Sequence, residues 1–319
     1  MISKKTIMQD AKDNDYKPEI LEKVFVLLKT LEQFMTIPFL RNQLVLKGGT
    51  ALNLFYFDTI PRLSVDIDLN YIGQTDKQAM QAERAIINDT ISQILQANQF
   101  ELSRSPAKHA GGKMIWRYPS MMGQMGNLEI DLNYMYRQPL WPVVFKKPHL
   151  PFATSVEIPV LDIHELAAGK LSALFSRTVS RDFFDAHHLF SKQPLDIEQL
   201  KLAFTIYLSM NSIDLSHLTP ERIDFNLADI RNRLLPVLRQ KEMPRAPGPL
   251  KEWATILRDE LREGLARLFP LNPEQIEFIT LVRTAGIIRP ELITQDKSLS
   301  ARILAHPLIR WIAQKFQAQ

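Results

Sequence analysis

Residues 47–71 read KGGTALNLFYFDTIPRLSVDIDLNY and decide the fold of the first half of the chain. Just before them, residues 43–47 form a short apolar run that predicts a β-strand. The pair Gly48-Gly49 predicts a tight turn into a helix. A second strand is expected at 63–71, where apolar and polar residues alternate. The predicted order is therefore strand, glycine turn, helix and strand.

The second strand carries two acidic residues with the spacing of a metal site. Residues i and i+2 of a strand point to the same face, so Asp66 and Asp68 share a face and lie about 6 to 7 Å apart at the backbone. Phosphoryl-type transfer uses two divalent ions about 3.5 to 4 Å apart, and Mg²⁺ prefers carboxylate oxygens. Asp131, in a later alternating strand at 127–134, is the expected third ligand, and Glu129 on the same face could take its place.

The glycine turn offers groups that bind phosphate. Backbone N–H groups at a helix N-terminus attract anions, and glycine lets the backbone approach a ligand closely. We therefore expect Gly48 and Gly49 to meet the β- and γ-phosphates of a nucleotide, with the Thr50 hydroxyl as a further donor. A GGT turn or a DID strand alone is weak evidence, and their order along the chain is the informative feature.

The rest of the first half predicts a small mixed sheet with helices. Helices are expected at 17–40 and 76–98, and residues 99–118 are expected to form a hairpin that turns at Gly111-Gly112. Proline is dense from 139 to 159, which predicts extended connections.

The proline-rich region is also the predicted boundary between two domains in an α+β fold. The first domain, 1–155, is expected to hold the acidic site, and the second, 156–319, is expected to be α-helical. Helices in the second domain are predicted at 162–176, 180–192, 196–210, 220–240, 250–267, 273–285 and 298–316.

Composition narrows the class of protein. The 319 residues are 45% hydrophobic and 23% charged, which is typical of a globular protein. No apolar run reaches about 18 residues and the N-terminus lacks a signal-peptide core, so we expect no membrane insertion and a cytoplasmic location. The absence of cysteine excludes disulfides, thiolate ligands and a cysteine nucleophile. Any metal must therefore bind Asp, Glu or His.

The formal net charge is only +4, but basic residues cluster in two stretches, 103–118 and 231–251. Such patches suit a polyanion, although each alone is equally consistent with an ordinary solvated surface. The basic residues of the two stretches are Arg104, Lys108, Lys113, Arg117, Arg231, Arg233, Arg239, Lys241, Arg245 and Lys251.

The order of the motifs resembles the DNA polymerase β-like nucleotidyltransferase superfamily, in which a Gly-Gly or Gly-Ser turn precedes Asp-x-Asp on the next strand. Within it, residues 47–71 resemble the AbiEii/AbiGii type IV toxin family, which includes the MenT toxins. The family's GGTAL turn and its R-x-S-x-D-I-D-L strand are both present, the strand as Arg62 to Leu69. The tail AHPLIRWIAQ, 305–314, is similar to the family's C-terminal segment.

A second signature of that family is similar to HELAAGKLSALFSRTVSRDFFDAHHL, residues 164–189. The resemblance implies that Lys170 grips the phosphates of a nucleoside triphosphate (NTP), and that an acidic helix with Asp182 and Asp185 orders this lysine or the acceptor. Surface or interhelix ion pairs, such as Arg181 with Asp185, are the alternative. The adjacent histidines 187 and 188 are expected to pack rather than to bind metal, because neighbours on a helix point about 100° apart.

The resemblance implies a metal-dependent nucleotidyltransferase toxin with Mg²⁺ or Mn²⁺, an NTP substrate, an RNA acceptor that is tRNA at its 3′ end, and a cognate antitoxin. The implied catalytic residues are Asp66, Asp68, Asp131, Lys170 and Asp182, the three strand aspartates being the metal ligands. The implied nucleotide-binding residues are Lys47, Gly48, Gly49, Thr50, Ser64, Lys170, Arg177, Arg181 and Asp185. Two alternatives remain open: transfer to a protein hydroxyl, and a non-catalytic module that binds RNA or a partner.

Overall fold

The computed structural model describes residues 3–105, 111–150, 156–244 and 246–317. The chain forms two compact units, which are described separately. The first unit contains 1–137, 143–161 and 235–243, and the second contains 138–142, 162–234 and 244–319. The main division between the units falls between Leu161 and Asp162, whereas the sequence predicts it between residues 155 and 156. Two short segments belong to the other unit than their neighbours in sequence: 138–142 to the second unit and 235–243 to the first.

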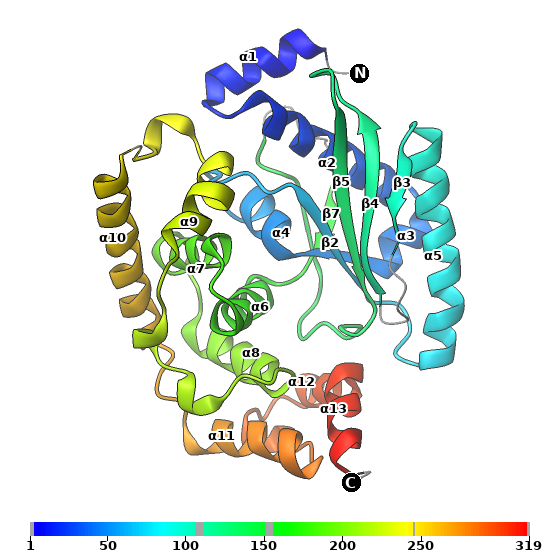
Figure 1. The fold of residues 1–319 in the computed structure, drawn as a ribbon. Coiled ribbons are helices and arrows are strands. Elements are labelled where there is room, and N and C mark those ends of the chain that lie inside the picture. The colour runs from blue at the N-terminus through cyan, green and yellow to red at the C-terminus, as the bar shows by residue number, and fades with distance from the viewer. Residues whose placement is uncertain (1–2, 106–110, 151–155, 245, 318–319) are drawn as a thin grey trace. The chain divides into compact units, whose positions relative to one another are not determined.

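A mixed sheet organises the first unit. Its strands, within the described residues, follow the order β3-β4-β5-β2-β1-β7-β6, and Figure 1 shows the β3, β4 and β5 part of this sheet. The pairs β2–β5 and β1–β7 are parallel and the other neighbours are antiparallel. The bounds are β1 Leu44–Lys47, β2 Asp66–Tyr71, β3 Glu101–Arg104, β4 Gly111–Pro119, β5 Met125–Asn133, β6 Val144–Lys146 and β7 Ile158–Val160.

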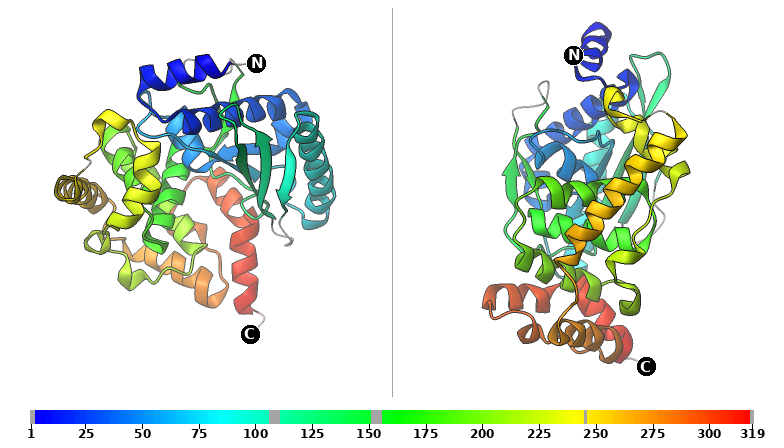
Figure 2. Two further views of the ribbon diagram at one scale, coloured as in Figure 1. Left: turned by 45° about the horizontal axis from the view of Figure 1, so that its top comes forward. Right: turned by 90° about the vertical axis from the view of Figure 1, so that its left-hand side faces the viewer.

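Helices cover the apolar face of this sheet. α2 packs on β2 and β5 and is amphipathic, with residues such as Leu27, Leu28 and Leu31 buried. α5 runs beside the β3–β4–β5 part of the sheet in both Figure 1 and the left view of Figure 2. Among the described residues, the α-helices of this unit are α1 Lys4–Asn14, α2 Pro18–Thr36, α3 Pro38–Gln43, α4 Gly48–Phe55 and α5 Lys77–Ala97, and short 3₁₀ turns lie at Leu235–Val237 and Gln240–Glu242.

Three predictions for this unit need correction. The helix expected at 17–40 stops at Thr36 and restarts at Pro38, because proline disfavours a helical residue before it. The hairpin β3–β4 forms, but Gly111 and Gly112 begin β4 rather than making the turn, and residues 106–110 lie outside the described residues. The proline-rich stretch contains the short strands β6 and β7, which were not expected.

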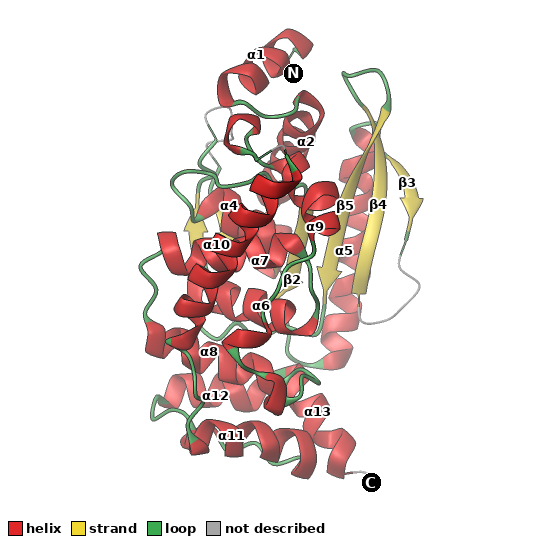
Figure 3. Ribbon diagram, turned by 60° about the vertical axis from the view of Figure 1, so that its left-hand side comes forward, coloured by secondary structure: helices red, strands yellow, loops and turns green. Residues whose placement is uncertain are grey.

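The second unit is built from helices, so the predicted α+β class is confirmed (Figure 3). Its α-helices are α6 Ile163–Ser176, α7 Ser180–Lys192, α8 Ile197–Ser209, α9 Leu227–Asp229, α10 Pro247–Ala266, α11 Pro273–Thr280, α12 Lys297–Ala305 and α13 Pro307–Gln317. Short 3₁₀ or π turns lie at Leu215–His217, Pro220–Arg222, Ile230–Leu234, Leu281–Ala285 and Pro290–Leu292. No helix in the described part of the chain combines the length and apolar character needed to span a membrane.

Two helix predictions for the second half are wrong. The single helix expected at 220–240 is a series of short helical turns on either side of α9. Pro236, which lacks an N–H, lies in the segment 235–243, which belongs to the first unit. The helix expected at 298–316 is divided into α12 and α13 at Pro307.

The segment 235–243 joins the first unit through its own bonds. The main-chain N–H of Leu63 donates to the carbonyl of Val237 over 2.9 Å. The Arg239 guanidinium lies 5.6 Å from the centre of the Tyr16 ring and donates from Nε to the Tyr16 hydroxyl over 3.2 Å. This segment thereby holds the chain directly ahead of β2.

Candidate functional site

Four carboxylates share one face of the sheet in the first unit. In the parallel pair β2–β5, Asp68 is in register with Asp131, and Asp66 is in register with Glu129. Residues in register on neighbouring strands point to the same side and lie about 4.8 Å apart. The residues between them, such as Ile67, are buried on the opposite face. The structure therefore places the three predicted aspartates together on one face.

The glycine turn lies against this face. α4 begins at Gly48, whose φ of +72° is a conformation that favours glycine. A Cβ atom on Gly48 would lie 2.2 Å from Oδ2 of Asp68, so the carboxylate packs directly on the turn. A Cβ atom on Gly49 would lie 2.6 Å from the Arg62 guanidinium. A side chain at either glycine would therefore have to displace Asp68 or Arg62.

The structure gives Thr50 a different role from the expected phosphate donor. Thr50 is fully buried, and its hydroxyl donates to the main-chain carbonyl of Asp66 over 2.5 Å and lies 3.0 Å from Oγ of Ser64. Ser64 is itself 5% exposed, and Arg62, at 2%, donates to the carbonyl of Leu63. These side chains form a buried polar support that ties α4 to the start of β2.

Two lysines flank the aspartates within the first unit. Lys47 is opposite Asp68 in the antiparallel pair β1–β2, so it shares the acidic face at the start of α4. Lys113 is opposite Asp131 on β4, and its ammonium lies 2.5 Å from Oε2 of Glu129. Lys108 of the same basic stretch lies outside the described residues.

The Lys113–Glu129 pair separates Glu129 from the aspartates. Desolvation alone would lower the pKa of Lys113, but the hydrogen bond and charge of Glu129, together with the charges of Asp66 and Asp68, raise it. Lys113 therefore stays protonated and offsets the charge of Glu129. This pairing favours Asp131 over Glu129 as the third ligand.

The three aspartates offer the donor set of a hard divalent cation. Their oxygens are the ligands that Mg²⁺ and Mn²⁺ prefer, and they project from one face beside the glycine turn. Among the described residues, no three His, Asp or Glu side chains are already gathered closely enough to hold an ion. Rotation of the aspartate side chains on this shared face is what would bring them to one ion.

The second signature forms a buried ion cluster in the second unit. Nζ of Lys170, on α6, lies 2.9 Å from Oδ1 of Asp182 and 3.0 Å from Oδ2 of Asp185, both on α7. The three side chains are 11%, 4% and 0% exposed. Nε of Arg177 lies 2.8 Å from the other oxygen of Asp182. α6 ends at Ser176, so Arg177 reaches Asp182 from the connection between the helices.

Charge pairing decides the ionisation of this cluster. Burial raises the pKa of Asp182, but the charges and hydrogen bonds of Lys170 and Arg177 outweigh burial and lower it. The two aspartates are three residues apart and face the same lysine, as expected for neighbouring positions on a helix. Arg181, the second residue of α7, is half-buried. The acidic helix thus orders Lys170.

A residue that the sequence did not reveal anchors this helix. Oδ2 of Asp229 accepts a 2.7 Å hydrogen bond from the main-chain N–H of Ser180, the first residue of α7. Asp182 lies in the same first turn of α7. Asp229 precedes Arg233, whose guanidinium pairs with it at 3.2 Å. No local pattern connects Asp229 with α7, because the contact spans 49 residues of sequence.

The adjacent histidines pack within the second unit. His187 pairs with Glu260 over 2.6 Å, and Nδ1 of His188 lies 3.0 Å from the carbonyl of Phe184. Burial lowers the pKa of His188 to about 4, so this ring is neutral at pH 7. The two rings serve helix packing.

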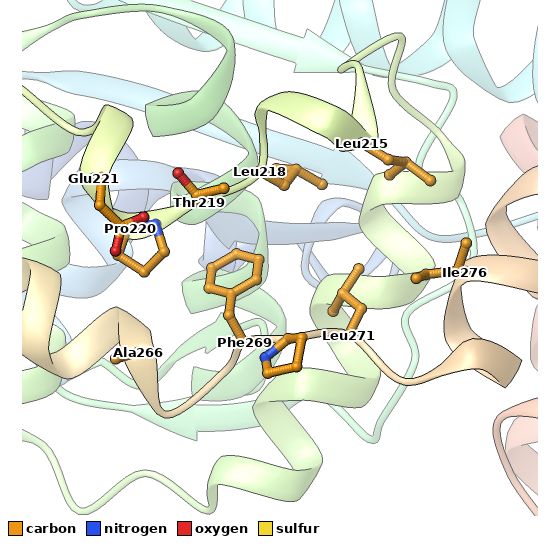
Figure 4. A pocket seen from close by; sticks show the side chains of 10 residues that line it. Leu215, Leu218, Thr219, Pro220, Glu221, Ala266, Phe269, Leu271 and Ile276 are labelled. Atoms are coloured by element: carbon orange, nitrogen blue, oxygen red, sulfur yellow. The ribbon is translucent and has the colours of Figure 1, made fainter.

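A pocket of about 430 Å³ in the second unit is unsuited to a nucleotide. Its lining includes Leu215, Leu218, Phe269 and Leu271, and Figure 4 shows these apolar side chains around the opening. No lysine or arginine of the described chain lines it, so it lacks groups that bind phosphate.

Comparisons with known proteins agree with the motifs. The family model described as nucleotidyl transferase AbiEii toxin, type IV TA system, matches residues 29–274. Among solved structures, MenT4, a nucleotidyltransferase toxin from Mycobacterium tuberculosis H37Rv, is similar with a TM-score of 0.61 and 15% sequence identity. The similarity covers 95% of this chain and 99% of that chain, and at this identity it shows the fold. Curated proteins give no match.

Proposed function

Because the chain belongs to the AbiEii family of nucleotidyltransferase toxins of type IV toxin–antitoxin systems, we propose that it transfers a nucleoside monophosphate from an NTP to RNA in a metal-dependent reaction. The acceptor we propose is the 3′ end of tRNA, which would place the activity in the cytoplasm. The observation that supports the reaction best is the register of Asp68 with Asp131 on one face beside the Gly48 turn.

The proposed roles follow from where the side chains lie. Asp66, Asp68 and Asp131 would hold Mg²⁺ or Mn²⁺, which neutralises phosphate charge and activates the attacking oxygen when bound. Asp131 is also the residue that would take the proton of the acceptor hydroxyl. The backbone N–H groups of Gly48 and Gly49, at the start of α4, would bind the β- and γ-phosphates.

We assign further phosphate contacts to two lysines. Lys47 lies on the acidic face next to the glycine turn. In the second unit, Asp182 and Asp185 hold the ammonium of Lys170 at 2.9 and 3.0 Å, which fixes its direction. Positioning and charge neutralisation supply most of the rate in reactions of this kind. A cognate antitoxin is the partner that the family implies.

The test is to incubate the protein with each of the four NTPs, labelled at the α-phosphate, with total tRNA and Mg²⁺. Label should enter RNA, and Asp66→Ala or Asp68→Ala should abolish the transfer without changing the circular dichroism spectrum. Undiminished transfer in either folded variant would exclude this metal site. Label that resists ribonuclease but not protease would instead identify a protein hydroxyl as acceptor.

A further inference from the structure

Three basic side chains continue the acidic face of the sheet outward. Lys113 and Arg117 alternate with buried residues on β4 and are exposed. Ile115, between them, is in register with Glu129 on one side and with Arg104 of β3 on the other. Arg104, Lys113 and Arg117 therefore share the face of the carboxylates, and we name them the basic ledge. Glu101, opposite Arg117, is an acidic neighbour on β3.

The order of the strands places the basic ledge and the glycine turn on opposite sides of the carboxylates. β1, which leads into Gly48, lies on one side of β2, whereas β5, β4 and β3 follow on the other. Under the proposed function, the triphosphate occupies the side of Gly48. The side of the basic ledge is then where the second substrate approaches.

Lys113 is the member of the basic ledge nearest to the reacting groups. It is opposite Asp131, the aspartate assigned to the acceptor hydroxyl, and Glu129 holds its ammonium at 2.5 Å. Its side chain is 47% exposed and that of Glu129 is 30% exposed. An ammonium has three N–H donors, so a single carboxylate partner fixes its position and leaves donors for an incoming anion.

We propose that Lys113 binds a phosphate of the acceptor RNA next to the attacking hydroxyl, and that Arg117 on the same strand and Arg104 on the neighbouring strand β3 extend this contact. The inference rests on the proposed function and assigns the acceptor to the side of the sheet opposite the NTP phosphates. Glu129 is then a positioning residue, which sets the direction of Lys113. A nucleic acid strand fits several basic positions on one face because its phosphates repeat along the chain.

The rival role of Lys113 is charge neutralisation of Glu129 alone. The variants Lys113→Gln, Glu129→Gln and the double variant separate the two roles. Lys113→Gln removes one positive charge, whereas the double variant removes one charge of each sign and leaves the net charge as in the wild type. A defect that persists in the double variant therefore reports the direct contact with RNA.

Binding of 5′-fluorescein-labelled bulk tRNA, followed by anisotropy without NTP, is the decisive measurement. Lys113→Gln and the double variant should each raise Kd by roughly 5- to 10-fold at low salt and reduce the slope of log Kd against log salt by about 1. Glu129→Gln should leave Kd within about twofold, because the lysine remains, and should lower kcat for transfer, because the ammonium is no longer held in one position. KM for NTP should stay unchanged in all three variants.

Lys29→Gln is the matched control. Lys29 pairs with Glu32 over 2.6 Å and its side chain is 53% exposed, but it lies on α2, which packs on the apolar side of the sheet. It should bind tRNA as the wild type does. Wild-type affinity in Lys113→Gln, its recovery in the double variant, or an equal loss in Lys29→Gln would each overturn the inference.

The transfer assay judges the proposed function separately. If the wild type labels RNA while Lys113→Gln keeps its tRNA affinity, the function stands and the inference fails. If the wild type labels no RNA and binds no tRNA, both fail. If it binds tRNA through Lys113 but labels none, the contact stands and the proposed reaction fails.

Discussion

Gly48 is the residue at which backbone conformation and site chemistry meet. Its φ of +72° costs a residue with a side chain about 1 to 2 kcal/mol, and a Cβ atom there would lie 2.2 Å from Oδ2 of Asp68. In Gly48→Ala the Asp68 carboxylate must turn away. We expect a loss of transfer of about 100-fold or more, since small displacements of reacting groups have effects of this size.

Gly123 provides the control for Gly48. Its φ is +98°, and a Cβ atom there would meet nothing within 4 Å. Gly123→Ala should therefore lower the free energy of unfolding through backbone strain while transfer stays at the wild-type rate. Urea unfolding and the labelled-NTP assay measure the two effects. Wild-type rates of transfer in both Gly48→Ala and Gly123→Ala would show that the position of the Asp68 carboxylate does not depend on the glycine turn.

At the scale of elements, α6 fastens the segment 138–142 through a buried carboxyl group. Glu165 is 2% exposed, and it accepts hydrogen bonds from the N–H of Leu140 at 2.9 Å and from the Tyr207 hydroxyl at 3.2 Å. Burial raises its pKa to about 8, although these hydrogen bonds act in the opposite direction. The protonated form is therefore the one that the folded chain favours.

This carboxyl group should give the fold a distinct dependence on pH. Between its ordinary value of 4.5 and a folded-state pKa of about 8, the folded chain holds a proton that the unfolded chain has lost. The contribution of Glu165 to stability is thus present below the lower value and is lost as pH rises towards 8. Glu165→Gln should remove this decline, measured as Tm between pH 5 and pH 8.5. A decline that is unchanged in the variant would contradict the assignment.

The elements also show which parts of the fold and the site are readable from sequence. The sequence predicts Asp66 and Asp68 on one face, as observed, because their spacing obeys the two-residue period of a strand. Their partner Asp131 lies in a strand with the same alternation. β6 and β7 escaped prediction because strands of three residues among prolines have too few positions to show a period.

Contacts between distant positions were not readable. The pairing of Lys113 with Glu129 depends on the register of β4 and β5, and that of Asp229 with Ser180 depends on how a late turn packs. A predicted helix at 220–240 failed because Pro236 and the bond from Leu63 to Val237 draw the chain into another unit. Local periodicity contains no information on any of these.

At the scale of the whole molecule, the first unit depends on a late part of the chain. Residues 235–243 belong to it, and their Val237 and Leu238 are buried. A chain of residues 1–161 alone lacks them and should unfold at a lower temperature than the same chain joined to 235–243 through a flexible Gly/Ser linker. The difference can be followed by Tm and by the protection of the Leu63 amide in hydrogen exchange. Equal Tm values would show that the segment contributes nothing to the unit.

The assignment of 138–142 to the second unit and of 235–243 to the first also limits what recombination between related genes can exchange. A single crossover between two related genes cannot exchange one whole unit for another, because each unit is encoded in several separated pieces. Exchange of a complete unit would need several crossovers, so substitutions within an intact gene are the simpler route to a new nucleotide or acceptor preference.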